Sequence, residues 1–170
     1  MPLPDLLATG LNVVFVGTAV TASSNAAEAY YATHGNSFYR VLHNVGITQE
    51  LILPEQYPSL IIHGVGLTDL VKERDALDKE LQHVDFDVEG FKKKMRLFSP
   101  RVICFNGKLA AAYFLFGNNK TERVQYGRQY EQFGNSIVFV APSTSRSALK
   151  YWEEDHYRAL AYLINNPQEE

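Results

Sequence analysis

The chain has few of the residues that build disulfide frameworks or metal sites. Its 170 residues include one cysteine, Cys104, which excludes an intrachain disulfide and lies in the apolar run 102–105. A cysteine in such surroundings is typically buried and unreactive. The five histidines show no pair at the spacing of metal ligands, so we expect no metal site. A chain without disulfides fits a reducing, intracellular compartment.

Several motifs that would assign a chemistry are also missing. No Gly-x-Gly-x-x-Gly follows the first apolar run, and no Gly-Lys-Ser/Thr occurs, so dinucleotide and P-loop chemistry are unsupported and no cofactor is expected. Ser143 lacks the Gly-x-Ser-x-Gly setting of a hydrolase nucleophile. No apolar stretch approaches the roughly 18 residues of a membrane span, and the first residues lack a basic and apolar leader. We therefore expect a cytoplasmic protein.

The hydrophobic residues, 46% of the chain, occur in short runs that alternate with helical patterns. Runs of four to six apolar residues predict buried strands at 11–16, 101–105 and 136–140. Helical spacing predicts helices at 38–45, 88–98 and 108–116, and Asp87 is a suitable N-cap for the second of these. This alternation predicts a three-layer α/β/α domain with a mainly parallel central sheet, which we expect to span residues 1–170 as one unit.

The remaining segments are less regular. Residues 60–72 are apolar, contain two glycines and end in polar residues, which predicts an irregular strand. The charged segment 73–87 predicts a surface loop or a frayed helix, and a final helix is expected at about 148–164. Small-residue loops at 17–24 and 141–147 each follow a buried strand, so both could open onto one edge of the sheet and face each other across a cleft.

Asp69 is the sharpest candidate for chemistry. It ends the segment Gly64 to Asp69, and a carboxylate at a cleft floor can orient and deprotonate a water molecule. The alternative is a helix N-cap or a turn-stabilising aspartate. The Gly-small-small loop 17–19 and the Tyr30-Tyr31 pair would give a floor with an aromatic wall, which suits a flat ligand such as a base.

The charges leave nucleic acid as an open partner. The net charge of −3 decides nothing, because an enzyme that visits DNA needs only a local positive face. The basic run Lys92 to Lys94 is either a solvated helix face or a DNA contact.

A set of short motifs, in matching order along nearly the whole chain, resembles the mismatch-specific uracil/thymine DNA glycosylases of the uracil-DNA glycosylase superfamily. The motifs are Gly10-Leu11 through Gly17, Ser23-Ser24, Tyr31, Asn36-Ser37-Phe38-Tyr39, Gly46-Ile47-Thr48, Gly64-Val65-Gly66-Leu67-Thr68-Asp69-Leu70-Val71-Lys72 and Pro142-Ser143. The resemblance implies a monomeric α/β enzyme that flips a damaged or mismatched base out of DNA and cleaves its N-glycosidic bond.

The resemblance also implies roles for individual residues. Asp69 would activate water, Tyr31 would stack on the flipped base, and Thr18, Ala19 and Asn36 would contact that base. Ser24 would lie near the DNA backbone. The second loop would enter the duplex through Pro142, Ser143, Thr144, Ser145 and Arg146.

Two departures from the family pattern bear on activity. The family's first loop reads Gly-Ile-Asn-Pro, with the asparagine positioning the water, whereas this chain has Gly17-Thr18-Ala19-Val20. Either Asp69 has taken over water activation, or the protein is a weak or inactive relative that recognises damaged DNA. The family's second loop reads Asn-Pro-Ser-Gly and this chain has Ala141-Pro142-Ser143-Thr144, so the opposite-base preference is expected to be relaxed. An enzyme acting on free nucleosides is a third reading of the loops alone.

Overall fold

The computed structural model describes residues 3–167, so residues 1–2 and 168–170 of the expected domain lie outside it. Its strands are β1 (Val13–Gly17), β2 (Val65–Asp69), β3 (Val102–Asn106), β4 (Gly127–Arg128) and β5 (Ile137–Ala141). Its α-helices are α1 (Ala22–Ala26), α2 (Phe38–Asn44), α3 (Val88–Phe98), α4 (Lys108–Phe116) and α5 (Asp155–Asn165). Short 3₁₀ helices are η1 (Pro54–His63), η2 (Asp78–Glu80), η3 (His83–Asp85), η4 (Thr121–Arg123) and η5 (Arg146–Tyr151).

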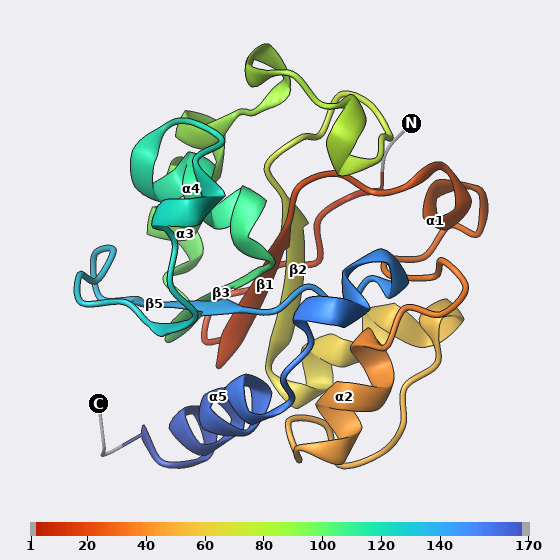
Figure 1. The fold of residues 1–170 in the computed structure, drawn as a ribbon. Coiled ribbons are helices and arrows are strands. Elements are labelled where there is room, and N and C mark those ends of the chain that lie inside the picture. The colour runs from red at the N-terminus through yellow and green to blue at the C-terminus, as the bar shows by residue number, and fades with distance from the viewer. Residues whose placement is uncertain (1–2, 168–170) are drawn as a thin grey trace.

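The five strands form one sheet in the order β2-β1-β3-β5-β4 (Figure 1). The pairs β1–β2, β1–β3 and β3–β5 are parallel, and only the two-residue β4 runs antiparallel to β5. The expected mainly parallel sheet is therefore confirmed. Because the four longer strands are parallel, the loops that follow them leave from the same edge of the sheet.

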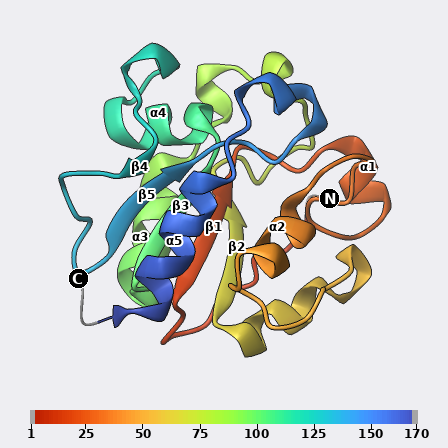
Figure 2. The same cartoon turned by 60° about the horizontal axis from the view of Figure 1, so that its bottom comes forward.

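Each face of the sheet has its own hydrophobic core, which completes three layers (Figures 1 and 2). Side chains of alternate strand positions, such as Phe15 and Cys104, pack with α2 and α5 on one face. The intervening positions, such as Val16 and Phe105, pack with α3 and α4 on the other. The strands therefore read as continuous apolar runs because both of their faces are covered.

Local signals place most of the elements where the sequence predicts them. The Asp87 carboxylate accepts a hydrogen bond from the Gly90 amide at 2.9 Å, which caps α3 as expected. Helix α4 ends at Gly117, whose φ of +71° is the left-handed conformation that glycine adopts without strain. Of the described residues, none belongs to a helix long and apolar enough to cross a membrane.

Two predicted elements are wrong in extent. Residues 60–63 complete η1 and do not begin the strand, since Pro58 interrupts regular hydrogen bonding, Gly64 ends the segment with a φ of +76°, and Ile62 is 82% exposed. The final helix begins at Asp155 and not at 148. Residues 146–151 form η5 because the Ser145 hydroxyl caps the Ser147 amide, and no apolar face there packs on the sheet.

Candidate active site

A cleft of about 1140 Å³ opens at the edge of the sheet where the parallel strands end. Its lining comes from the loop after β1, the end of β2, the turn after β3 and the loop after β5. The two small-residue loops therefore face one cleft, as the sequence predicts. The segment 76–79 and Tyr126 also contribute to the lining.

The first loop is fixed against the end of β2. Gly17 lies opposite Asp69 in the parallel register, and beyond it the Leu70 amide donates to the Gly17 carbonyl at 3.0 Å. The Val71 amide donates to the Thr18 carbonyl at 2.8 Å. A Cβ atom on Gly17 would lie 2.6 Å from Oδ1 of Asp69, closer than such atoms approach, so glycine is required for this carboxylate to reach the cleft.

Asp69 is a buried carboxylate, and one of its two oxygens accepts no hydrogen bond from the described residues. The residue is 5% exposed, and its Oδ2 accepts no hydrogen bond from residues 3–167. The closest cation is Lys72, whose Nζ lies 3.9 Å from Oδ2. Burial raises the pKa of Asp69 to about 7, although the Lys72 charge opposes this rise. A carboxylate that titrates near neutral pH is suited to accept a proton from a nearby water molecule.

Tyr31 forms an aromatic part of the cleft lining beside Asp69. Its ring stacks on Phe38, with 4.0 Å between ring centroids. Its φ of +55° is uncommon for a tyrosine, which indicates that the surrounding structure holds it in place. Burial, with the nearby Asp69 charge, raises the pKa of Tyr31 well above its usual value, so its hydroxyl stays neutral.

The second loop is held by neutral hydrogen bonds. The Asn106 side chain at the end of β3 donates to the Thr144 hydroxyl and accepts from the Thr144 amide, each at 3.0 Å. The Thr144 carbonyl accepts from the Ser37 amide at 3.0 Å, which ties the loop to the start of α2. The buried Tyr157 hydroxyl donates to the Pro142 carbonyl at 3.0 Å.

The cleft gathers nearly all the residues that the sequence nominated. Its lining includes Thr18, Ala19, Ser24, Tyr31, Asn36, Asp69, Ser143, Thr144, Ser145 and Arg146. Pro142 is buried outside the lining. The hydroxyl of Ser24 accepts from the Ala32 amide at 3.0 Å, so it also stabilises the turn that leads to Tyr31.

Three further polar residues at or behind the cleft were not nominated. Asn106 stops the β3 strand, and the carboxyl end of a parallel strand is a signal that could have identified it. The Thr18 hydroxyl donates to Oδ1 of Asp78 at 2.5 Å, across sixty residues of sequence, and no sequence pattern predicts that pair. Lys72 belongs to the motif that contains Asp69, but its contacts depend on the N-terminal segment.

The described part of the chain holds no cluster of three or more histidine, cysteine, aspartate or glutamate residues that could bind a metal ion.

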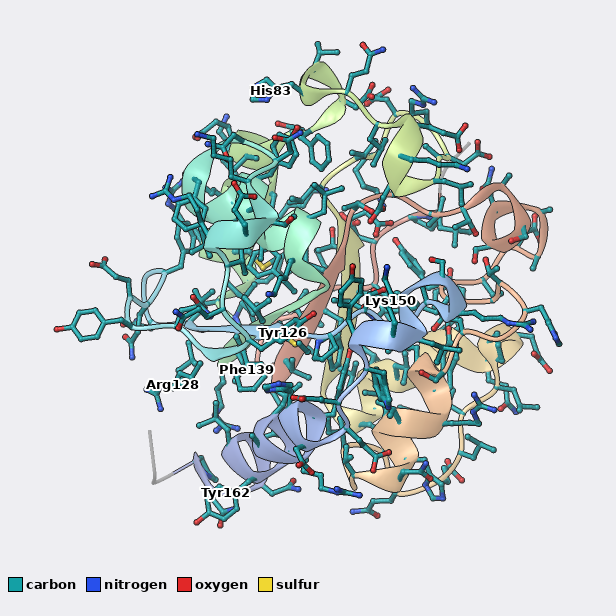
Figure 3. The ribbon with its side chains drawn as sticks, viewed as in Figure 1. His83, Tyr126, Arg128, Phe139, Lys150 and Tyr162 are labelled. Atoms are coloured by element: carbon teal, nitrogen blue, oxygen red, sulfur yellow. The ribbon has the colours of Figure 1, made fainter. Side chains whose placement is uncertain are left out.

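Figure 3 shows His83 at the outer edge of the view and Tyr126 nearer its centre. Tyr126 lines the cleft, and Nζ of Lys108 lies 4.4 Å from its ring centroid. This pair places a positive charge over an aromatic ring at the cleft.

Comparison with known proteins identifies the family of the chain. A family model described as the uracil DNA glycosylase superfamily matches residues 4–164. The solution NMR structure of a candidate uracil DNA glycosylase from Methanosarcina acetivorans superposes with a TM-score of 0.67 at 21% identity, covering 96% of this chain and 97% of that one. The structural match supports the same α/β fold, and the family match extends over almost every described residue. The chain therefore belongs to the uracil DNA glycosylase superfamily.

Proposed function

We propose that this protein is a monofunctional DNA glycosylase that excises uracil and other deaminated or mismatched bases, with Asp69 as the residue that activates water. One observation carries the proposal. Asp69 lies in the cleft against Gly17 with Oδ2 buried and accepting no hydrogen bond within residues 3–167. A buried acceptor without a partner is costly, so its retention fits a role in binding a water molecule during the reaction.

The proposed reaction requires only a proton acceptor for the attacking water and a negative charge near the sugar. Cleavage of an N-glycosidic bond develops positive charge on the sugar ring, which a nearby carboxylate stabilises. As the C1′–N bond breaks and the nucleobase leaves as an anion, the water oxygen would bond to C1′ and its proton would pass to the carboxylate; the released nucleobase takes a proton from solvent. Ala19 stands where the family has its water-positioning asparagine, and its methyl side chain cannot bind water. Asp69 would therefore position and activate the water instead.

The extrahelical base would lie between the first loop and Tyr31. Stacking of a base on an aromatic ring contributes about 1–3 kcal/mol, and Phe38 behind Tyr31 keeps that ring in place. The backbone of Thr18 and Ala19 would contact the edge of the base, with Asn36 at the rim. Flipping is least costly for a mismatched or damaged base, which gives selectivity before any contact in the pocket.

The second loop would contact the duplex. Arg146 is exposed at the cleft and packs over Gly35, where a Cβ atom would lie 2.7 Å from the arginine Cδ. Thr144, Ser145 and Arg146 follow Pro142-Ser143, where the mismatch-specific relatives carry a different sequence. We therefore propose that the protein acts as a monomer on duplex DNA with a relaxed opposite-base preference.

Single-turnover cleavage tests the proposal. Oligonucleotides with uracil opposite guanine, uracil opposite adenine, or uracil in a single strand would be incubated with the wild type and Asp69→Asn. We expect base release by the wild type and a loss of about 10²–10⁴-fold in Asp69→Asn, the range for a positioned base. Asp155→Asn is the matched control, because Asp155 is an exposed carboxylate in the first turn of α5. Equal rates for the wild type and Asp69→Asn would contradict the assignment.

Ala19 supports a second candidate function, the recognition of damaged DNA without cleavage. A wild type that binds a mismatched duplex with a strong salt dependence but leaves every substrate intact would favour this candidate. Activity on free nucleosides without DNA would instead favour a nucleoside hydrolase.

A further inference from the structure

A half-buried ionic cluster lies beside Asp69. The N-terminal segment pairs with β2 through two hydrogen bonds between Leu6 and Leu67, each at 2.9 Å. This pairing places Asp5 beside Thr68, whose hydroxyl donates to Oδ1 of Asp5 at 2.7 Å. Lys72 and Lys94 both contact Asp5, with distances of 3.0 Å and 2.6 Å between nitrogen and oxygen.

The three protons of the Lys72 ammonium group are all occupied by acceptors other than Asp69. Nζ lies 2.8 Å from the Leu3 carbonyl, 3.1 Å from the Tyr30 hydroxyl and 3.0 Å from Oδ1 of Asp5. An ammonium group has three protons to donate. Oδ2 of Asp69 lies 3.9 Å from Nζ of Lys72, so it interacts with the charge of Lys72 but accepts no hydrogen bond from it.

Lys72, Lys94 and Asp5 together carry one excess positive charge, which favours the ionised form of Asp69 against the effect of burial. Two ammonium groups, Lys72 and Lys94, accompany two carboxylates, Asp5 and Asp69. These groups are half-buried, since the Lys72 side chain is 22% exposed and that of Asp5 17%, so solvent partly screens their charges. Burial has the larger effect, so the pKa of Asp69 is raised although the two lysines oppose the rise.

We infer that Lys72 is a positioning residue for base excision: its charge favours the carboxylate form of Asp69 against the effect of burial, while its hydrogen bonds to other acceptors leave Oδ2 without a donor among the described residues. This role rests on the proposed function of Asp69. An ordinary ion pair would donate to Oδ2 and lower the proton affinity of the carboxylate further, whereas this arrangement supports the charge without that hydrogen bond.

Other charged and titratable groups act on Asp69 from the surrounding elements. They are Asp5 from the N-terminal segment, Lys94 from α3, Asp78 from η2, and Tyr30 and Tyr31 from the segment before α2. Asp5 and Asp78 oppose ionisation, and Lys94 favours it less strongly than Lys72 does. Removal of Lys72 and removal of Asp5 should therefore move the titration of Asp69 in opposite directions.

The experiment is a ¹³C NMR titration of the aspartate carboxyl groups in the free protein, with Asp69→Asn used to assign the Asp69 signal. We expect the midpoint for Asp69 to rise by roughly 1–3 pH units in Lys72→Met, the effect of one opposite charge within about 4–6 Å, and to fall in Asp5→Asn. Lys93→Met removes an exposed lysine of the same helix as Lys94 and should leave the midpoint unchanged. If Lys72→Met does not fold, Lys72→Gln can still donate to the Leu3 carbonyl and replaces it.

A kinetic measurement separates this inference from the proposed function. In single-turnover excision, the midpoint of the rise with pH should move alkaline in Lys72→Met, and the rate should recover at high pH. A purely structural role would lower the rate at all pH values alike. A Lys72→Met midpoint equal to that of the wild type, or shifts of the same sign in Lys72→Met and Asp5→Asn, would overturn the inference. If the wild type excises no base, the proposed function fails, and the titration still decides the role of Lys72.

Discussion

The two walls of the cleft are built from similar loops but are held by different forces. We call the loop after β1 with the end of β2 the charged wall, because Asp69 and Asp78 line it and Lys72 lies behind it. The loop after β5 is the amide wall, because the Asn106 side chain holds it. Both follow parallel strands at the same sheet edge and both are rich in small residues. Under the proposed function, the charged wall would supply the reactive groups, whereas the amide wall would position the substrate.

The largest expected difference between the two walls is in how each makes the stability of the protein depend on pH. The pKa of Asp69 is about 7 in the folded protein and near 3.8 in the unfolded chain, so between these values the folded state binds more protons. Stability therefore falls as pH rises through this window, by up to about 4 kcal/mol from this group. In Asp69→Asn the part of the fall that comes from this group should be absent, so the variant gains unfolding free energy relative to the wild type from pH 4 to pH 7.

Urea denaturation at pH values from 4 to 8 measures that difference. Asp155→Asn again serves as control, since it removes a carboxylate from the exposed surface of α5. A difference between Asp69→Asn and the wild type that stays constant with pH would show that Asp69 is not held in an unfavourable ionised state by the fold.

The amide wall should respond to mutation without such a pH window. Asn106→Ala removes both hydrogen bonds to Thr144, and each contributes about 0.5–1.5 kcal/mol, so we expect a loss of roughly 1–3 kcal/mol. Thr144→Val removes only the hydroxyl partner and should cost about half as much. Because Asn106 and Thr144 are both neutral, the losses should be equal at pH 5 and pH 8 in urea denaturation. A loss that varies with pH would mean that the two walls are coupled.

The sequence predicts the loops that form the two walls better than it predicts the contacts that hold these loops in place. Apolar runs that stop at Gly17 and Asp69 place both residues at the carboxyl ends of buried strands, and parallel strands bring such ends together. Asn106 ends a run in the same way. These local patterns predict the two loops at one edge of the sheet, whereas the assignment of Ala19, Ser24 and Asn36 to the site depends on the family resemblance.

The ionic cluster and the segments around η1 and η5 depend on contacts that are distant in sequence. Asp5 reaches Lys72 only because Leu6 pairs with Leu67, and an isolated two-residue bridge leaves no periodic signal. Residues 146–151 have helical composition, yet Leu149 is 59% exposed and finds no core to pack on. Tertiary packing decides which secondary structure such segments adopt, because their intrinsic helix propensity is too weak to decide it.

The smallest expected effect concerns Tyr31, which lies between the two walls. Burial, together with the nearby Asp69 charge, raises the pKa of Tyr31, and the nearby Asn106 side chain opposes that rise. This hydroxyl is buried and has no hydrogen-bond partner among the residues described. Tyr31→Phe keeps the ring that stacks on Phe38 and removes only the unpaired group, so we expect unchanged stability or a gain of up to about 1 kcal/mol.

The adjacent Tyr30 is the matched control, because its hydroxyl donates to the Pro4 carbonyl at 3.0 Å and accepts from Lys72 at 3.1 Å. Tyr30→Phe should therefore lose about 1–2 kcal/mol, since it leaves a charged donor with one acceptor fewer. Urea denaturation of the two variants at the same pH compares them directly. A loss in Tyr31→Phe as large as that in Tyr30→Phe would mean that the Tyr31 hydroxyl bridges the charged and amide walls through an ordered water molecule, and that the cleft is one polar network with no division between its walls.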